Sequence, residues 1–498
     1  MTGGFFYKGG YMVSYYMVGI KGTGMASLSV LLSEMGGLVR GCDTAEVFST
    51  DALLAQNHIF ADVGFEAANL PLETDVVIFS TAYLPSTPIL AEAVRRGKEM
   101  YSYVEFLAKL TKERDSYVVC GTHGKTTVTA ATSFLLSQGK RTSYPFFSVF
   151  GSNLVGRTRM FCQGMEYFLL EGCEYQDHFL RYRTRGALVT AVEWDHPDYF
   201  KDEKAVCESF LKFCSGIEKG GFCVICVDGT QTRRLASSLA KRRADIRIIP
   251  YGFSHRGPLR IRPFVGGGYT VDLIEMPYHF PVSSQAWVDD FVGAAILATA
   301  MLLDAKDVKL YLPENSLVTD EVFPSVLSSM LSDLAGYPGT IGRMEVTGEE
   351  GEITYIDDYA HHPTQIRVVL ESLRLTYRNR HILVVFRPHT VSRTTALFSE
   401  FVTALSFADK LIIQNTYASA RGDGDVQGNS SENLAKALQE RMLTHYHIPL
   451  QAVIFAKDDE EAIEIANSWL LPGDLCVTMG AGNNRHLADS IRDRRRKG

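Results

Sequence analysis

A stretch of twelve residues, 117–128, combines an apolar run with glycines, a lysine and threonines. The apolar run at 117–120 predicts a buried strand, and residues 128–136 predict a helix. In such a turn the backbone amides and the helix N-terminus face an anion, a lysine adds positive charge, and a threonine hydroxyl can ligate Mg²⁺. The sequence therefore predicts a phosphate-binding loop, with candidate contacts from Gly121, Thr122, His123, Gly124, Lys125, Thr126 and Thr127.

The glycines of this loop are closer together than in the most common phosphate loops. Four residues usually separate the first glycine from the Gly-Lys pair, whereas only two lie between Gly121 and Gly124. The shortened loop argues against the common motor and GTPase families and favours a narrower group.

A second glycine-rich turn, residues 19–24, lies between a predicted strand and a predicted helix at 26–35, and Asp43 ends the next strand. Such glycines let the backbone approach a pyrophosphate, and the acid can accept a ribose hydroxyl. No further glycine stands three residues after Gly24, which favours a diphosphate nucleotide over a nicotinamide dinucleotide. The candidate contacts are Gly22, Gly24, Met25 and Asp43.

Acidic residues and a histidine follow two predicted strands of the second block. Glu171 and Glu174 come after the strand at 167–170, and residues 193–198 follow the strand at 187–192 and include His196. Carboxylates at the carboxyl ends of parallel strands face the crevice where ligands bind, and beside a phosphate loop they can hold Mg²⁺. Alone, the Glu171 run would be a solvated charged turn. Thr126 and Glu171 are therefore candidate metal ligands, and His196 is a candidate metal ligand or phosphate contact.

The last third of the chain has two further clusters after predicted strands. Residues 357–363 hold two aspartates, His361 and His362, which is uncommon for an ordinary loop. Residues 386–394 include Arg387, His389 and Arg393, and arginine suits bidentate contacts to carboxylate or phosphate. A glycine turn at 478–484 is a weak signal alone.

Strands alternate with helices throughout, which predicts an α/β protein with parallel, helix-covered sheets. We expect three domains, at residues 1–112, 113–335 and 336–498, and a β-ribbon insertion at 258–280.

The composition is that of an ordinary globular protein, with 498 residues, 46% of them apolar and 21% charged. A net charge of −7 gives no indication that the protein binds nucleic acid or an anionic membrane. Residues 1–17 are a poor signal peptide, and we expect no window long enough to span a membrane. Nine cysteines are scattered; Cys223 and Cys226 lie in a strand-like run, which favours a core role over zinc or redox chemistry. These features predict a reducing, cytoplasmic location.

In this order, the motifs resemble the Mur ligase family, the ATP-dependent amide ligases of peptidoglycan precursor synthesis. The resemblance covers nearly the whole chain. Its most specific part is Asp-Asp-Tyr-Ala-His-His-Pro-Thr at residues 357–364. The short phosphate loop and the runs at 19–25, 171–174, 195–196 and 388–394 also match.

The resemblance implies a Rossmann-like UDP-binding domain, a central P-loop ATPase-like domain and a C-terminal Rossmann-like domain. It implies ATP and Mg²⁺, and an acyl phosphate route that joins an amino acid, most closely L-alanine, to UDP-N-acetylmuramate. The protein would be a monomer or a homodimer. The resemblance implies catalytic roles for Lys125, His196, His361 and Arg393. It also implies that Arg393 and His362 contact the acceptor.

Three positions depart from the family pattern. Lys21 replaces a loop glycine, Thr390 replaces a basic residue, and residues 284–292 lack a His-Asn pair that helps to hold adenine and ribose. Three alternatives stay open: a relative that ligates a preformed peptide, echoed by residues 173–175; a nucleotide sensor without turnover; and a dehydrogenase, which the second phosphate loop disfavours.

Overall fold

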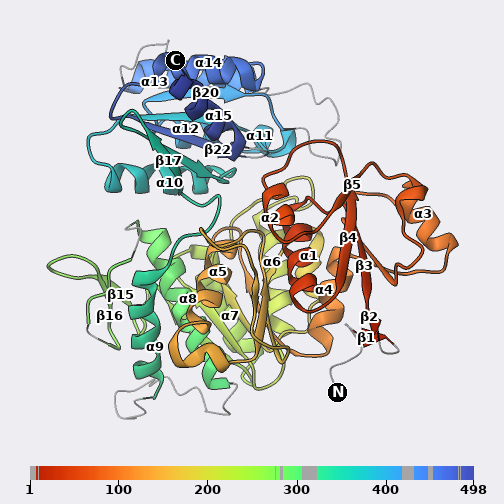
Figure 1. Cartoon of the computed structure of the whole chain (residues 1–498). Coiled ribbons are helices and arrows are strands. Elements are labelled where there is room, and N and C mark those ends of the chain that lie inside the picture. The colour runs from red at the N-terminus through yellow and green to blue at the C-terminus, as the bar shows by residue number, and fades with distance from the viewer. Residues whose placement is uncertain are drawn as a thin grey trace.

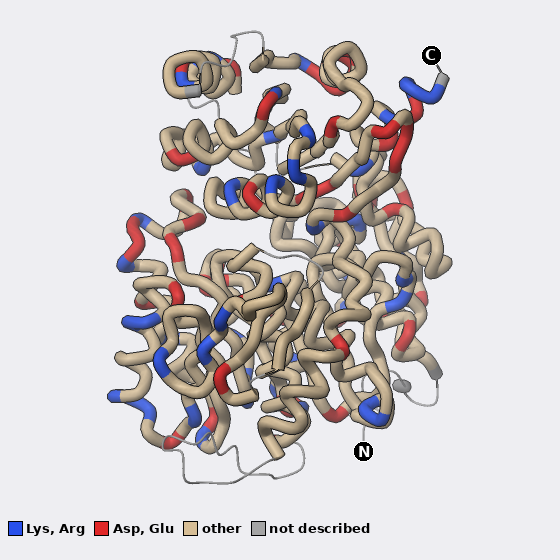
Figure 2. Tube along the Cα trace, turned by 90° about the vertical axis from the view of Figure 1, so that its left-hand side faces the viewer, with Lys and Arg blue, Asp and Glu red and all other residues tan. Residues whose placement is uncertain are grey.

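The computed structural model describes residues 7–8, 11–274, 276–280, 284–304, 322–417, 431–446, 452–480, 482 and 484–497. The chain forms three α/β units, each built on its own sheet, with the C-terminal unit above the central one and the N-terminal unit beside it (Figure 1). Figure 2 shows Lys and Arg interspersed with Asp and Glu along most of the trace. The α/β class predicted from the sequence is confirmed.

The N-terminal unit has a five-stranded sheet in the order β5-β4-β3-β6-β7, with every pair parallel. Its strands are β3 (Ser14–Val18), β4 (Leu38–Asp43), β5 (Ala61–Val63), β6 (Val76–Phe79) and β7 (Glu99–Ser102). The helices are α1 (Thr23–Glu34), α2 (Asp51–Gln56), α3 (Pro88–Arg95) and α4 (Tyr103–Lys112). A short antiparallel hairpin, β1 (Tyr7–Lys8) and β2 (Tyr11–Met12), precedes the sheet.

The central unit has a seven-stranded sheet in the order β10-β9-β11-β8-β12-β13-β14, and only β10 (Phe161–Cys162) is antiparallel. The other strands are β8 (Asp115–Cys120), β9 (Phe146–Val149), β11 (Tyr167–Gly172), β12 (Gly186–Val189), β13 (Phe222–Cys226) and β14 (Arg247–Tyr251). Its helices are α5 (Lys125–Leu136), α6 (Glu203–Ser215), α7 (Thr230–Arg242), α8 (Gln285–Asp304) and α9 (Val322–Asp333). The predicted β-ribbon is present as β15 (Ile261–Pro263) and β16 (Tyr269–Val271).

Helix α8 corrects the expectation that no segment is long and apolar enough to span a membrane. It has 20 residues and a mean hydropathy of 1.6, but 83% of its apolar window is buried inside the protein. α5 and α9 pack against it, and it contacts β12 and β13. A helix surrounded in this way is apolar on all sides because every side contacts protein.

The C-terminal unit has a six-stranded sheet in the order β17-β18-β22-β19-β20-β21, with β17 (Glu345–Glu350) antiparallel at its edge. The remaining strands are β18 (Ile353–Asp358), β19 (Ile382–Arg387), β20 (Lys410–Gln414), β21 (Val453–Ala456) and β22 (Leu475–Gly480). The helices are α10 (Pro363–Thr376), α11 (Val391–Ala396), α12 (Phe398–Leu405), α13 (Ser431–Tyr446), α14 (Asp459–Trp469) and α15 (Asn484–Lys497).

The two faces of this last sheet bury separate apolar clusters. Ile356 and Val384 point into the cluster with α10, α12 and α13, whereas Tyr355 and Leu383 point into the cluster with α14 and α15. This alternation follows from the two-residue period of a strand. The N-terminal and central units instead share one continuous core, which joins α1 and α4 to the central sheet.

Two strands run further than the sequence suggested. β11 includes Glu171 as its next-to-last residue, and β18 ends with Asp357 and Asp358, so these acids belong to the strands and not to the loops that follow. The edge strand β17 was not predicted, because its acidic sequence lacks an apolar alternation. Cys223 and Cys226 are buried in β13, as expected for core residues.

We expect Leu297→Ala, in the buried middle of α8, to lower the free energy of unfolding by about 2–5 kcal/mol, because it leaves a cavity in a packed core. Leu302→Ala on the same helix removes an equal volume from a partly buried position and should cost less. Urea unfolding followed by circular dichroism measures both values. Equal losses would contradict the packing described for α8.

Candidate active site

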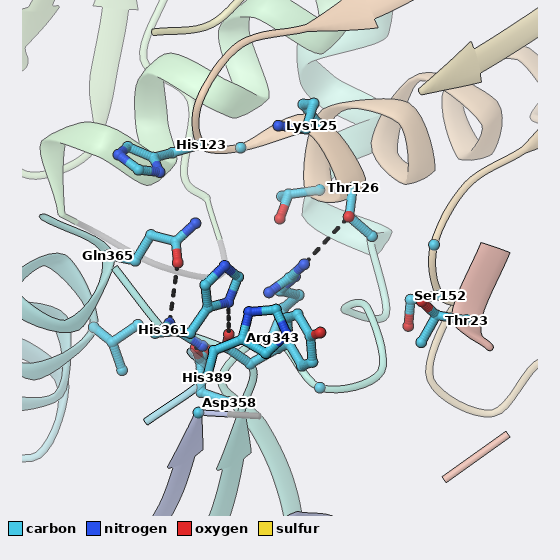
Figure 3. Close-up of a pocket in the computed structure, with 18 of the residues that line it drawn as sticks. Thr23, His123, Lys125, Thr126, Ser152, Arg343, Asp358, His361, Gln365 and His389 are labelled. Atoms are coloured by element: carbon cyan, nitrogen blue, oxygen red, sulfur yellow. Dashed lines mark hydrogen bonds between the residues drawn. The ribbon is translucent and has the colours of Figure 1, made fainter. Parts of the chain in front are cut away.

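The carboxyl ends of the three sheets face one continuous cavity of about 1040 Å³. The phosphate loop lies in its middle, the glycine turn before α1 on one side, and the ends of β18, β19 and β22 on the other. Figure 3 shows this junction, with Thr23 and Ser152 to one side of Lys125 and Thr126, and His361 and His389 below them. Groups from all three units can therefore act on the same ligands.

Two glycines shape the phosphate loop. Gly121 has φ +144°, and a Cβ there would lie 2.0 Å from the Thr190 hydroxyl. Gly124 has φ +79°, and a Cβ there would lie 2.4 Å from a carboxylate oxygen of Asp290. Because other residues would clash at both positions, the loop keeps the tight turn that directs α5 toward the cavity.

Lys125 is the partly buried cation of the loop. Its Nζ donates to Glu174 Oε2 at 2.9 Å and Oε1 at 3.2 Å, and also to the Gly121 carbonyl. Burial is the strongest single influence and lowers the pKa of Lys125, but the neighbouring charges, led by that of Glu174, and the hydrogen bond to Glu174 together outweigh burial, so the pKa is raised. The ammonium is therefore charged in the cavity wall, with a carboxylate where a phosphate would otherwise bind.

Thr126 and Glu171, two of the three predicted metal ligands, lie together. A Cβ on Gly151 would be 3.7 Å from Glu171 Oε2 and 3.9 Å from the Thr126 hydroxyl, so the two side chains border one small space. The Gly151 amide donates to Glu171 Oε1 at 2.8 Å, and Arg343 donates to Thr126 at 3.2 Å (Figure 3). Hard oxygen ligands beside a phosphate loop suit Mg²⁺.

His196, the third predicted ligand, lies beside Glu174. Its Nε2 is 3.8 Å from Glu174 Oε1 and 3.9 Å from Asp195 Oδ2. The residue has φ +53°, uncommon for a residue with a side chain, and its amide donates to Asp195 Oδ1 at 2.6 Å. Burial lowers the pKa of His196, which favours the neutral imidazole that binds metals.

Arg393 is held behind the cavity wall. Its Nε donates to Asp195 Oδ1 at 2.7 Å, both side chains are almost fully buried, and its NH1 lies 2.9 Å from His389 Nδ1. Burial opposes ionisation of Asp195, but Arg393 and His196 hold its pKa well below the usual range. Arg393 is not among the cavity-lining residues, whereas Arg387 and His389 are.

His361 lines the cavity with a defined tautomer. Its Nδ1 lies 2.8 Å from the Tyr359 carbonyl, so Nδ1 carries the ring proton and Nε2 has the lone pair. Burial and the neighbouring Arg393 lower the pKa of His361 well below the usual value. The Gln365 side chain accepts from the His361 amide (Figure 3).

His362 joins the phosphate loop to the C-terminal unit. Its ring lies 4.6 Å from that of His123, and Glu193 accepts from His123 at 3.3 Å and from Thr364 at 2.7 Å. His123, Glu193 and His362 are residues of the types that bind metals, and their ligand atoms lie close together. The Thr364 amide, however, donates to His362 Nδ1, so the buried Nε2 carries the ring proton and has no lone pair for a cation. The cluster is a polar contact between domains.

The glycine turn of the N-terminal unit only partly matches its prediction. Gly22 lines the cavity, but a Cβ on Gly24 would lie 2.8 Å from the Tyr103 hydroxyl, and Met25 is buried. The buried Asp43 carboxylate accepts the amides of Lys21 and Thr44 and the Tyr83 hydroxyl, and it does not line the cavity. Gly24, Met25 and Asp43 therefore support the turn from the side away from the cavity.

Several cavity residues were not among the predicted site residues, and Glu174, Arg343 and Asp290 are three of them. The sequence drew attention to Glu174, because this residue belongs to the Glu-x-x-Glu run, but its pairing with Lys125 depends on the fold. The sequence drew no attention to Arg343, in a glycine-containing stretch, or to Asp290, inside an apolar helix. Burial raises the pKa of Asp290 to about 7 and that of Asp357 also to about 7.

We expect His362 to make stability depend on pH below neutrality. Burial and the nearby His123 lower the pKa of His362 to about 4, against an ordinary 6.5. Between these values the unfolded chain binds the proton and the folded chain does not, so stability falls as pH falls through this window and is unaffected above it.

At pH 5 this difference amounts to about 2 kcal/mol. From pH 7 to pH 5, wild type should therefore lose about 2 kcal/mol more unfolding free energy than His362→Gln, whose side chain does not titrate. Urea unfolding at the two pH values provides the comparison. An equal loss in both proteins would show that His362 is protonated in the fold.

Three family models cover most of the chain. They are the Mur ligase family catalytic domain at residues 14–115, the Mur ligase middle domain at 119–285 and the Mur ligase glutamate ligase domain at 342–482. The UDP-N-acetylmuramate–L-alanine ligase of Treponema pallidum is 32% identical over 499 residues and 96% of each chain. That of Desulfitobacterium hafniense is 32% identical over 486 residues, covering 96% of this chain and 98% of the relative.

Solved structures with the same fold include the UDP-N-acetylmuramate–alanine ligase of Thermotoga maritima, with a TM-score of 0.71 and 19% identity over 97% of this chain and 99% of that one. A murein peptide ligase of Psychrobacter arcticus has a TM-score of 0.67 and 18% identity over 97% and 98%. At these identities the likeness concerns the fold.

Proposed function

The chain belongs to the Mur ligase family, and from this premise we propose that it joins L-alanine to UDP-N-acetylmuramate in an ATP-dependent reaction. The observation that carries the proposal is the single cavity in which a phosphate loop lies between a glycine turn and a polar sheet edge. The names of the curated relatives support the choice of substrates. This reaction would supply a precursor of peptidoglycan.

The phosphates of ATP would bind the amides of residues 121–127, with Lys125 leaving Glu174 for the phosphate charge. The carboxylate of UDP-N-acetylmuramate would attack the γ-phosphorus, forming an acyl phosphate and releasing ADP. Thr126 and Glu171 would hold Mg²⁺, which stabilises charge on the transferring phosphoryl group. His196 would support this cluster from beside Glu174.

The second step would use the C-terminal unit. The amine of L-alanine attacks the acyl carbon and displaces inorganic phosphate as the amide bond forms. His361 lines this cavity and has its lone pair on Nε2, so this residue would accept the amine proton. Arg393 would act on the acceptor through His389, which it contacts and which lines the cavity. His362 would hold the acceptor loop against the phosphate loop.

We further propose domain boundaries at 1–112, 113–335 and 336–498, with the first domain holding the UDP half. Nine free cysteines among the described residues agree with a reducing, cytoplasmic location.

Phosphate release with UDP-N-acetylmuramate and a panel of acceptors tests the function. L-alanine should give the highest kcat/KM. Turnover only with L-alanyl-γ-D-glutamyl-meso-diaminopimelate would favour the peptide-ligating alternative. No turnover with any acceptor would favour the nucleotide sensor.

Lys125→Ala should abolish ATP-dependent ligation, because the loop loses its only lysine, while binding of UDP-N-acetylmuramate persists. The variant leaves Glu174 buried without its partner, so Lys125→Ala/Glu174→Gln serves as the control for folding. Phosphate release and calorimetric binding of the UDP-substrate give the two readouts. Loss of both in a folded protein would contradict the division of roles between domains.

Arg393→Ala should raise the KM for L-alanine about tenfold or more, with a smaller change in the KM for ATP. Arg387→Ala, in the same sheet edge but lining the cavity, is the comparison. A larger effect at Arg387 would mean that this residue binds the acceptor carboxylate and that Arg393 only positions its neighbours. An effect of Arg393→Ala confined to ATP would overturn the acceptor role.

A further inference from the structure

Lys21 stands where the family pattern has a glycine, and it makes more contacts than a turn residue requires. Its backbone amide donates to Asp43 Oδ2 at 2.7 Å, and its carbonyl accepts the Thr50 hydroxyl. Its side chain is 12% exposed, and Nζ donates to the carbonyls of Thr44 at 3.1 Å and Glu46 at 2.6 Å. Lys21 therefore joins the glycine turn to the segment after β4.

That segment, residues 44–51, is also held from its other end. Asp51 Oδ2 accepts the Phe48 amide at 2.9 Å, and Asp51 Oδ1 lies 3.5 Å from the Lys21 ammonium. The ammonium is 5.7 Å from the centre of the Phe48 ring. The three N–H groups of the lysine thus face two carbonyls and one carboxylate, all on one segment.

The segment forms one wall of the nucleotide-sugar side of the cavity. Val47 and Phe48 line the cavity, as do Lys21, Gly22 and Thr23 of the glycine turn. Val47 is 65% exposed, and the Phe48 ring is partly buried. An aromatic ring and an aliphatic side chain that face a cavity offer a flat apolar surface, which suits the face of a base.

We propose that Lys21 is a positioning residue: it fixes residues 44–51 so that Val47 and Phe48 form the contact surface for the pyrimidine base of the UDP-substrate. The ammonium acts on the segment and not on the diphosphate, because its donors are already directed at Thr44, Glu46 and Asp51. This inference rests on the proposed function, which assigns the UDP half to this domain.

The test compares uridine with UDP, because only UDP carries the phosphates. In Lys21→Met, which keeps the aliphatic stem but loses the donors, affinity for uridine and for UDP should both fall about tenfold. The KM for UDP-N-acetylmuramate should rise by a similar factor, with kcat and the KM for ATP within about twofold of wild type. Ligand-observed NMR measures uridine binding, and calorimetry measures UDP binding.

Asp51→Asn weakens the same segment from the other side and should lower both affinities in the same direction, which keeps the test available if Lys21→Met does not fold. Lys109→Met is the matched control: it removes a 2.9 Å ion pair with Glu99 in the same unit, outside the cavity lining. It should leave both affinities unchanged.

A loss of UDP affinity with uridine binding unchanged would overturn the proposal, because Lys21 would then contact phosphate directly. Unchanged affinity for both ligands in Lys21→Met and Asp51→Asn would also overturn it. If wild type binds neither uridine nor UDP, the assigned role of the first domain fails, and that outcome is separate because it does not depend on any variant.

Discussion

The Lys125–Glu174 ion pair is the interaction on which the rest of the cavity depends. A lysine in a buried phosphate loop loses hydration, and without a partner it would favour the neutral amine. Glu174 keeps it charged and is itself only 2% exposed. Each group therefore makes the burial of the other tolerable, and removing one would leave an unpaired charge. The loop can then exchange a carboxylate for phosphate without a change in protonation.

The position of this pair follows from the topology of the central sheet. β8 and β11 are parallel neighbours, so the loop after β8 and the residues after β11 emerge at the same edge. β12 pairs with β8 on its other side and delivers Glu193, Asp195 and His196 to that edge. The central unit thus supplies the loop, its counter-charge and the candidate metal ligands before either flanking unit is considered.

The flanking units attach to this centre in different ways. The N-terminal unit shares a continuous apolar core with it, which favours a fixed relation between the glycine turn and the phosphate loop. The C-terminal unit has its own two clusters and, in the part of the chain that the structure describes, does not share a buried core with the centre. It meets the centre through the polar pairs Arg393–Asp195, Thr364–Glu193 and Arg343–Thr126 and through partly buried apolar side chains such as Trp194 and Met344. Polar contacts of this kind are easier to separate than a shared core, so the acceptor unit is the one suited to moving during turnover.

These contrasts explain how far the sequence could lead. The phosphate loop, the acidic strand ends and the α/β class were predictable because each depends on local pattern: apolar runs, glycines and the residues that follow them. The partners of Lys125, Asp43 and Arg393 were not predictable, because contacts across 49, 40 and 198 residues are set by packing.

The two lysines of the glycine-rich turns show what local sequence leaves undetermined. Lys125 and Lys21 both lie in glycine-rich turns between a strand and a helix, and each contacts two carbonyls and one carboxylate. The carbonyls that Lys125 contacts belong to its own loop, Gly121 and Thr122, whereas Thr44 and Glu46, the carbonyl partners of Lys21, lie on the separate segment after β4. A phosphate that replaces Glu174 leaves Lys125 bonded to its own loop, whereas a phosphate that drew Lys21 away would release residues 44–51, so we expect the two lysines to differ in function although their local sequences are alike.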